Sequence, residues 1–465
     1  MGAGTGALLS SMAEAQAPAE LISKRPKASE RKFTSEAIEK TIAEVKPRIA
    51  DPVLAWLFEN CFPNTLDTTV QFHDSGSQPD TFVITGDIDA MWLRDSSAQV
   101  WPYLPFARED AQLRRMLAGV IHRQSRCILI DSYANAFLPS ASSPPLSWSV
   151  HDKTEHKPGV GERKWEVDSL CYPIRLAYGY WKNTRDISPF DAEWAQAAQT
   201  ILDTFRVQQR KHGPGPYRFQ REAWSPTETL ALDGLGNPAA PVGMIFSMFR
   251  PSDDACIFPL FVPANLFAVA SLRQLSEMAS KILPNSDLAQ SAHALADEVF
   301  AALQKYGYMQ TAQGGRTWAY EVDGYGGQLF MDDANVPSLL SLPYLQCCAV
   351  SDPIYVSTRA RVLSSANPYF FSGTAAAGVG SPHTGLNQIW PIAIIMRALT
   401  STNNAEIRQC LEWLKTTNAG TGFMHESFDK DNPRQYTRSW FAWANSLFGE
   451  LILTLAHKKP ELLRA

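Results

Sequence analysis

"SWFAWANSLFGELILTLA", residues 439–456, is apolar on nearly every face of the helix that it predicts. A helix that is apolar all round is buried all round. Five further stretches have the same character: 92–106, 169–181, 257–272, 336–345 and 387–399. The chain therefore carries six segments that we expect to be buried helices.

Segments of a second kind alternate with the buried ones. In residues 110–124 and 192–205 the apolar side chains recur at i, i+3, i+4 and i+7, which predicts helices with one apolar face. Similar patterns occur around residues 35–59, 285–305, 353–366 and 403–416. The alternation predicts an all-α fold, an (α/α)6 barrel of six inner and six outer helices. An irregular helical bundle or a solenoid fits the same pattern, but no repeat at a fixed period supports a solenoid.

The domain organisation is expected to be simple. No linker interrupts the chain after residue 35, so residues 35–465 should form a single domain. Residues 1–34 are expected to be a disordered tail, with the remnant of a leader sequence as the alternative. Short strands are expected in the long connections, for example around residues 68–87.

Composition excludes several classes of partner. The net charge of −5 leaves no polybasic surface for nucleic acid or an anionic membrane. No stretch approaches the roughly 18 uninterrupted apolar residues of a membrane span. Seven scattered cysteines without CxxC spacing indicate neither a disulfide framework nor a zinc site. With no N-glycosylation sequon, these features favour a cytoplasmic location over secretion, and we expect a monomer.

Polar clusters recur at or just before the buried helices, for example "DIDAMWLRDS", "FRPSDDA" and "GFMHESFD". In an α/α barrel these segments would converge at one end of the inner ring. The candidate site residues are Asp89, Trp92, Arg94, Asp95, Trp165, Glu166, Asp168, Asp253, Asp254, Asp332, Asp333, Asn335, His383, His425 and Glu426.

This set of side chains suits a sugar. Carboxylates, amides and arginine bind vicinal hydroxyls through directional hydrogen bonds, and indole rings cover the apolar face of a pyranose. The scarcity of lysine in the clusters argues against a phosphate ligand. Each cluster also has a structural interpretation: Arg94 and Asp95 as a buried ion pair, and the paired aspartates as helix caps. The clusters point to a site because all are predicted to lie at one end of the barrel.

The segments "DIDAMWLRDSSAQVWPYL", "RKWEVDSLCYPIRLAY", "FRPSDDACIFPLFVPANLF", "FMDDANVPSLLSLPYL", "GSPHTGLNQIWPIAII" and "HESFDKDNPRQYTRSWFAWANSLFGELI" resemble glycoside hydrolase family 125, in order, from about residue 45 to 456. The resemblance implies an (α/α)6 barrel and metal-independent, inverting hydrolysis of terminal α-1,6-linked mannose from a glycan, without a cofactor. It also implies a general acid at Asp253 or Asp254, a general base at Glu426, and hydroxyl contacts from Arg94 and Asp95.

Two other functions fit the residues. A sugar epimerase or isomerase on the same barrel would use a pair of histidines as acid and base, and His383 and His425 both lie in the clusters. A non-catalytic glycan-binding protein would bind without turnover, but it gives no reason for spatially separated carboxylates. Inverting hydrolysis gives such a reason, because water must fit between two carboxyl groups about 6.5–9.5 Å apart.

Overall fold

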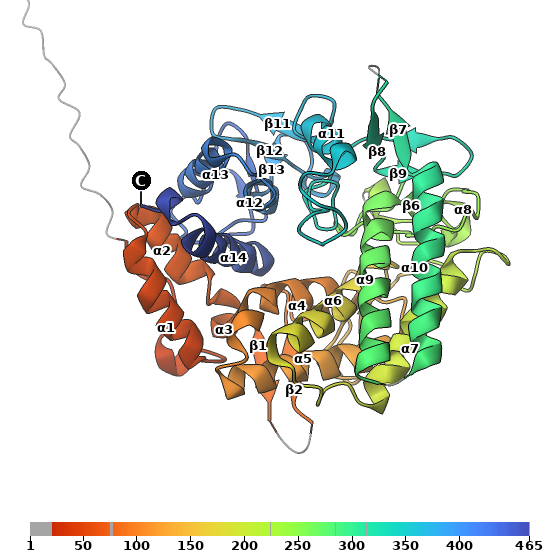
Figure 1. Ribbon diagram of the computed structural model, residues 1–465, viewed down its shortest axis with the longest axis horizontal. Helices are drawn as coiled ribbons and strands as arrows, with labels where there is room; N and C mark the ends of the chain where they lie inside the picture. The colour runs from red at the N-terminus through yellow and green to blue at the C-terminus, as the bar shows by residue number, and fades with distance from the viewer. Residues whose placement is uncertain (1–20, 75–77, 224, 284, 312–313, 465) are drawn as a thin grey trace, which may run out of the picture.

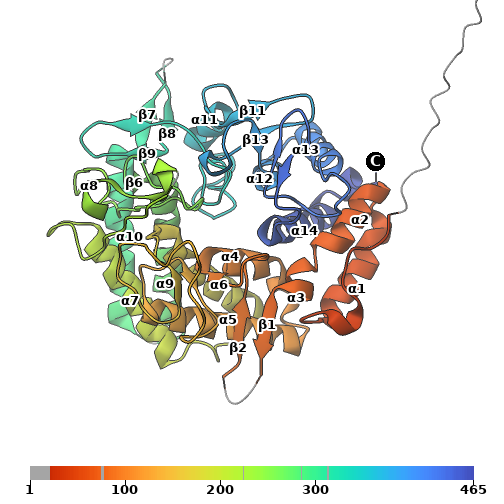
Figure 2. The same ribbon diagram turned by 180° about the vertical axis from the view of Figure 1, so that it is seen from behind.

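The computed structural model describes residues 21–74, 78–223, 225–283, 285–311 and 314–464. Its helices form a ring around which the chain runs once, so that the last helix lies beside the first ones (Figures 1 and 2). The backbone N–H of Ala50 donates to the carbonyl of Leu463 over 2.8 Å, which joins the two ends of the ring. The architecture is helix-rich and resembles an α/α barrel.

Five of the expected buried segments form helices that line the inside of the ring. They are α4 (Leu93–Val100), α6 (Val167–Thr184), α9 (Val262–Lys281), α12 (Pro391–Leu399) and α14 (Ala442–Lys458). Helix α14 contacts α4 and α12, and α6 contacts α4 and α9, so these helices pack side by side in ring order. Their burial on most faces confirms the interpretation of the apolar stretches.

The expected amphipathic helices lie on the outside. They are α1 (Glu36–Val45), α2 (Pro52–Cys61), α5 (Ala111–Ile130), α7 (Ala192–Gln208), α10 (Ser286–Tyr306), α11 (Pro353–Val362) and α13 (Asn404–Thr416). Each begins at a Ser, Asp or Asn whose side chain accepts a backbone N–H of the first turn, the usual N-terminal cap. The five inner helices have no such side-chain cap. Other segments supply acceptors instead: the first N–H groups of α4, α6 and α9 donate to the carbonyl of Asn135, the hydroxyl of Ser247 and the carbonyl of Tyr320.

The prediction of a sixth inner helix at residues 336–345 is wrong, because this segment consists of bends and turns. Pro343 lacks an N–H and would clash with the carbonyl four residues earlier in a helix. Ser338 and Ser341 bond each other's backbone N–H groups with their hydroxyls, an arrangement that competes with helical hydrogen bonds. The buried Asp332 carboxylate accepts the backbone N–H of both Leu339 and Leu340, at 2.8 and 3.0 Å. Local bonds thus hold an apolar segment in place without a helix.

Short strands occupy the connections, so the fold is not strictly all-α. The described residues contain fifteen strands in six small sheets. The hairpin of β1 and β2 confirms the strands expected around residues 68–87. The strands are β1 (Val70–His73), β2 (Asp80–Val83), β3 (Met91–Trp92), β4 (Ala136–Phe137), β5 (Val160–Glu162), β6 (Leu260–Phe261), β7 (Tyr308–Gln310), β8 (Arg316–Trp318), β9 (Glu321–Val322), β10 (Gln328–Leu329), β11 (Phe370–Ser372), β12 (Ala377–Val379), β13 (Gln388–Ile389), β14 (Ser427–Asp429) and β15 (Tyr436–Thr437).

The N-terminal boundary differs from the expected one. Residues 21–34, assigned to a disordered tail, pack on the first helices: the Trp56 indole donates to the carbonyl of Ile22 over 2.7 Å. Arg25 forms ion pairs with Glu39 and with Asp67, which is buried in the short helix α3 (Asn64–Thr68). These contacts hold residues of the 21–34 segment against the folded chain. Residues 1–20 lie outside the described residues.

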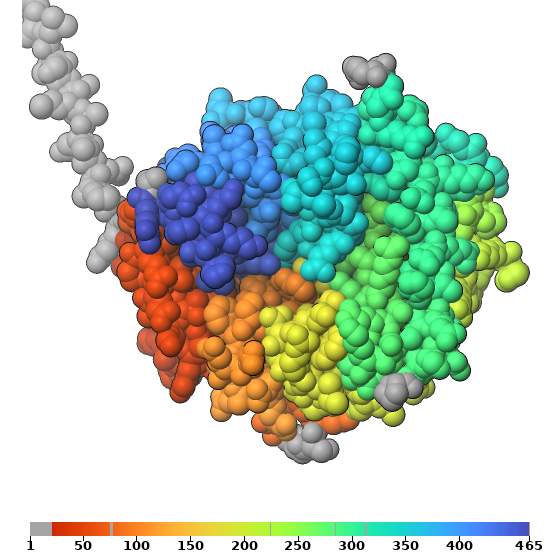
Figure 3. Space-filling view, viewed as in Figure 1, coloured from red at the N-terminus to blue at the C-terminus, as the bar shows by residue number. Residues whose placement is uncertain are grey.

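Two further findings bear on the composition. All seven cysteines are unpaired, and five of them are buried. None of the helices in the described ranges combines the length and the apolar character needed to cross a membrane. The space-filling view shows the same circular order of segments at the surface, with C-terminal residues against N-terminal ones (Figure 3).

Candidate active site

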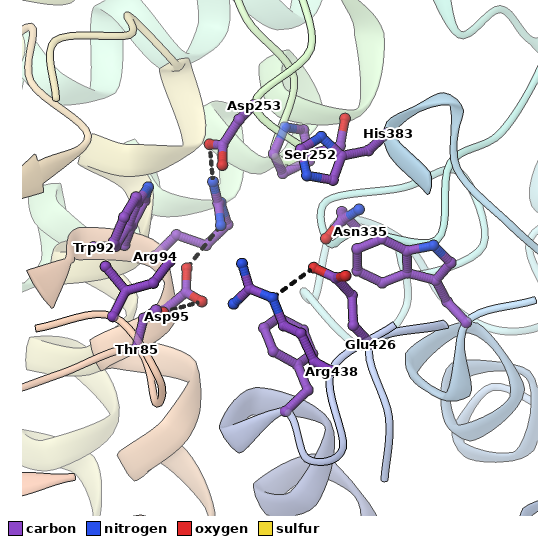
Figure 4. A pocket seen from close by; sticks show the side chains of 14 residues that line it. Thr85, Trp92, Arg94, Asp95, Ser252, Asp253, Asn335, His383, Glu426 and Arg438 are labelled. Carbon is purple, nitrogen blue, oxygen red and sulfur yellow. Dashed lines mark hydrogen bonds and ion pairs between the residues drawn. The ribbon is translucent and has the colours of Figure 1, made fainter. Parts of the chain in front are cut away.

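A pocket lies where the inner helices begin, and its lining comes from segments spread along the whole chain (Figure 4). Trp92, Trp390 and Phe441 are each the last residue before an inner helix, namely α4, α12 and α14. The N-terminal ends of these three helices therefore lie at the pocket. The complete lining is Thr85, Ile88, Trp92, Arg94, Asp95, Pro251, Ser252, Asp253, Asn335, His383, Trp390, Glu426, Arg438 and Phe441.

One wall of the pocket is built around Arg94, in the first turn of α4. Its guanidinium contacts four carboxylates, those of Asp95, Glu166, Asp168 and Asp253, at 2.7, 3.2, 3.3 and 3.1 Å respectively. Asp95 also accepts a hydrogen bond from the Thr85 hydroxyl at 2.7 Å. Asp95 and Arg94 thus form a buried ion pair and line the pocket at the same time.

The carboxylates around Arg94 differ in their proton affinity. Burial raises the pKa of Glu166 well above its usual range, and it raises the pKa of Asp168 to about 7. At Asp253 burial acts in the same direction, but the Arg94 guanidinium and the Lys164 ammonium outweigh it and hold the pKa at about 2. The low pKa of Asp253 thus favours its ionised form, the raised pKa of Glu166 favours its protonated form, and Asp168 has a pKa near neutral.

Asp253 and Asp254 do not start a helix but lie in a tight turn. Phe249 and Ala255 pair as an isolated bridge across the turn, and Asp253 has φ 69°, in the left-handed region. The turn directs the two side chains to different places. Asp253 lines the pocket with 25% of its side chain exposed, while Asp254 is 1% exposed and faces His383, with 3.7 Å between carboxylate and imidazole.

The opposite wall carries Glu426 and Arg438. Strands β14 and β15 pair antiparallel, with Ser427 opposite Thr437. Glu426 directly precedes Ser427 and Arg438 directly follows Thr437, so this register brings Glu426 and Arg438 together. Arg438 Nε lies 3.3 Å from the Glu426 carboxylate, and its Nη1 lies 2.9 Å from that of Asp87. The hairpin thus presents a carboxylate with a fixed cation beside it.

Asn335 and His383 complete the lining. The Asp333 carboxylate accepts the backbone and side-chain N–H groups of Asn335, both at 3.0 Å, and the Ser381 hydroxyl at 2.9 Å. Ser381 in turn accepts the backbone N–H of His383. Burial lowers the pKa of His383, but Asp254 more than compensates and brings it to about 9. Buried Asp333 therefore holds both lining residues in place, and His383 is a cation at neutral pH.

Eight of the fifteen predicted site residues are not part of the pocket lining. Glu166, Asp168, Asp254 and Asp333 contact lining residues from behind, as described above, and the other four have separate roles. Trp165 is fully buried against Tyr133 and Phe205, and its indole donates to a backbone carbonyl. Asp332 accepts the backbone N–H groups of Leu339 and Leu340 in the turn segment described above. Asp89 is exposed outside the pocket, and His425 stacks on Tyr436 with ring centroids 3.9 Å apart. His383 lines the pocket and His425 does not, so the two histidines do not both face this pocket as an epimerase would require.

Seven lining residues were not among the predictions: Thr85, Ile88, Pro251, Ser252, Trp390, Arg438 and Phe441. Two of them had a signal in the sequence. Trp390 and Phe441 stand directly before apolar helices, the position that Trp92 also occupies. The pairing of Arg438 with Glu426 depends on the register of the β14–β15 hairpin, and the sequence alone does not predict that register.

Three potential metal ligands gather beside the pocket. One ligand atom each from Glu228, Asp254 and His383 lies within 4.8 Å of the others. The Lys164 ammonium lies 2.7 Å from Glu228, and Arg221 lies 3.1 Å from the same carboxylate. These cations already neutralise Glu228, and His383 is protonated at neutral pH, so the group is better suited to ion pairing than to coordination.

Comparisons with known proteins agree with this geometry. Residues 51–453 match the family model of metal-independent α-mannosidases, GH125. The chain is 44% identical, over 97% of its length and 91% of the relative's, to the meiotically up-regulated gene 157 protein of Schizosaccharomyces pombe. It superposes with a TM-score of 0.87 on a Streptococcus pneumoniae metal-independent α-mannosidase solved with α-1,6-mannobiose in a non-productive complex. That enzyme is 42% identical, and the match covers 92% of this chain and 100% of the other.

A more distant match concerns the fold alone. A bacterial glucoamylase solved with acarbose is 13% identical and has a TM-score of 0.53, over 88% of this chain and 57% of the other. The family match spans most of the chain and includes every residue that lines the pocket. The protein is therefore a glycoside hydrolase, and it belongs to family 125, the metal-independent α-mannosidases.

Proposed function

We propose that the protein is an inverting, exo-acting α-1,6-mannosidase in which Asp253 is the general acid and Glu426 the general base. The observation that carries the proposal is the position of these two carboxylates on opposite walls of one pocket (Figure 4). Asp253 is favoured over Asp254 because it is exposed to the pocket, whereas Asp254 is covered and paired with His383.

The reaction divides the work between the two walls. The terminal mannose lies against the wall formed by Trp92, Arg94 and Asp95, where the indole covers part of the ring and the polar pair binds its hydroxyls (Figure 4). Asp253 gives a proton to the glycosidic oxygen as the bond to the anomeric carbon breaks. Glu426 takes a proton from a water molecule that attacks the same carbon from the opposite face, and Arg438 holds Glu426 in position. The product is β-mannose.

Exo action is supported by the buried side chains behind Arg94. Glu166 and Asp168 are both fully buried there, so protein fills the space on that side of the pocket. The α-1,6 linkage is carried over from the Streptococcus pneumoniae relative, which was solved with α-1,6-mannobiose. The substrate is thus the non-reducing end of an α-mannoside glycan.

The architecture fits the same proposal. We infer an (α/α)6 barrel in which residues 336–345 take the place of one of the six inner helices, with residues 35–465 as a single catalytic domain that works as a monomer. The hydrogen bond between Ala50 and Leu463 supports one closed unit, and residues 21–34 extend it toward the N-terminus.

Product analysis on α-1,6-, α-1,2- and α-1,3-linked mannobiose tests this function. We expect mannose from the α-1,6 isomer, unaffected by a chelator, and β-mannose as the first anomer in proton NMR. A longer α-1,6-linked oligosaccharide should lose one mannose at a time. Early α-mannose would refute inversion and the role of Glu426, and internal fragments would refute exo action.

A further inference from the structure

The cluster behind the pocket holds more carboxyl groups than it can keep ionised. Arg94 is the guanidinium in contact with Asp95, Glu166, Asp168 and Asp253. Three of these carboxyls have side chains at most 6% exposed, and burial disfavours the charged form of each. Three other cations lie nearby, but each is engaged elsewhere. The Lys164 ammonium is bound to the backbone carbonyl of Asp253 and to Glu228, His383 faces Asp254, and Arg438 pairs with Glu426 and Asp87. The four carboxyls in contact with Arg94 outnumber its single positive charge, and this imbalance favours a proton on one of the buried ones.

Glu166 is the member best placed to share that proton with Asp253. A single atom of Arg94, Nη2, lies 3.2 and 3.3 Å from the two oxygens of Glu166 and 3.1 Å from Oδ1 of Asp253. The two carboxyl groups therefore meet on one side of the guanidinium. The Ser169 hydroxyl donates to Oε2 of Glu166 over 2.7 Å and fixes its orientation.

Asp168 stands differently. It faces Nε of Arg94 at 3.3 Å, on another edge of the guanidinium, and neither of its oxygens has a hydrogen-bond partner in the described structure. Asp168 thus belongs to the same charge cluster but has no contact of its own with the proposed acid. This difference supplies a matched control for Glu166.

We propose that Glu166 is a positioning residue that stores the proton of the general acid and passes it to Asp253 when substrate is bound. The proposal rests on the proposed roles of Asp253 and Glu426. The raised pKa of Glu166, caused by burial, and the low pKa of Asp253 beside Arg94 are consistent with a resting proton on Glu166.

The proton balance of a turnover is closed. The Glu166 proton moves to Asp253, and from Asp253 to the leaving oxygen, which keeps the electron pair of the broken C–O bond. Glu426 receives a proton from the attacking water. Glu426 then releases that proton to solvent, and the cluster takes up one proton from solvent, so that no other reactant is consumed.

The different exposure of Asp253 and Glu166 explains why the proton moves from Glu166 to Asp253 only when substrate is bound. Asp253 has a side chain 25% exposed to the pocket, while that of Glu166 is fully buried. A bound sugar covers Asp253 and removes its hydration, which raises its affinity for a proton. The environment of Glu166 changes little, so the proton shifts toward the glycosidic oxygen only in the complex.

The first test is infrared spectroscopy of the free enzyme at neutral pH, with glutamate side chains labelled with carbon-13. A protonated, label-sensitive carboxyl band is expected, and part of it should disappear in Glu166→Gln. Burial also raises the pKa of Glu450, so a spectrum of Glu450→Gln separates any signal of that residue from the signal of Glu166. A band unchanged in Glu166→Gln, or a cluster band that responds to labelled aspartate alone, would overturn the proposal without any need for turnover.

The second test compares α-1,6-mannobiose with dinitrophenyl α-mannoside, whose leaving group needs no proton. Glu166→Gln should lower kcat on the disaccharide about a hundredfold, with KM little changed, and lower kcat on the aryl substrate less than about tenfold. Asp168→Asn removes a carboxyl from the same cluster and should affect both substrates alike. Glu166→Asp keeps a proton-holding group and should recover part of the lost kcat on the disaccharide.

Equal losses of Glu166→Gln on both substrates, or the same pattern in Asp168→Asn, would mean that Glu166 is a structural part of the cluster. Should Glu166→Gln not fold, the labelled wild-type spectrum and Glu166→Asp decide the question. A wild-type enzyme that cleaves neither mannoside would contradict the proposed function and leave the infrared result standing.

Discussion

Replacing Asp253 by asparagine should identify the acid, because Asp254 offers the same substitution one residue away. Asparagine keeps an oxygen for the contacts from Arg94 and Asn135, at 3.1 and 3.3 Å, but supplies no acidic proton. General acid catalysis contributes about 10²–10⁴ in rate. Asp95, the neighbouring carboxyl in the lining, is only 6% exposed and bound to Arg94, so it cannot substitute. We therefore expect a loss of about a thousandfold in kcat on α-1,6-mannobiose, about 4 kcal/mol.

The assay compares this loss with that on dinitrophenyl α-mannoside. Asp253→Asn should lose less than about tenfold there, because the leaving group departs without a proton. Asp254→Asn breaks the ion pair with His383 and should lower kcat on both substrates by a similar, smaller factor. The reverse result, with selective loss of the disaccharide in Asp254→Asn, would refute the argument from exposure.

Three further predictions concern the base, a pH effect and the turn segment. Glu426→Gln should lower kcat about a thousandfold or more while mannose binding, measured by calorimetry, persists; a loss of binding instead would indicate a substrate-holding role. The pKa of His383 is raised to about 9, so its ion pair stabilises the fold fully below about pH 6.5 and is lost as the pH rises through 9. The Tm of the wild type should fall over that range more than that of His383→Gln, and parallel curves would contradict this. Asp332→Ala should lower the free energy of unfolding by about 2–4 kcal/mol, since two buried N–H groups lose their acceptor; Asp332→Asn, which keeps one acceptor oxygen, should lose less, and equal losses in denaturant melts would argue against capping.

The ring of helices could be predicted because the spacing of apolar residues indicates which helices are buried on all faces and which on one face. Five apolar stretches became inner helices, and the amphipathic segments between them became the outer ones. Residues 336–345 failed because their composition is that of a buried helix while Ser338, Ser341 and Pro343 favour local turns. Average apolarity indicates where a segment lies and does not determine its backbone.

The sequence predicts which polar clusters form the candidate site, but not which of their side chains reach the pocket surface. The sequence places polar residues at one end of the barrel, and seven of the fifteen candidates line the pocket. It does not tell which side chain reaches the pocket and which stands behind it, as Glu166 does. That depends on the turn at Asp253 and on the register that brings Arg438 to Glu426, and both are tertiary features.

The closure of the ring between Ala50 and Leu463 has a consequence for synthesis on the ribosome. The ribosome adds Arg94, in one wall of the pocket, about 350 residues before it adds Phe441, which also lines the pocket. At about ten residues per second, roughly half a minute separates the two events. During that time α4 lacks its neighbour α14, and its apolar side chains and buried charges have no finished core. A nascent chain should thus stay inactive, and dependent on chaperones, until its last helix has emerged.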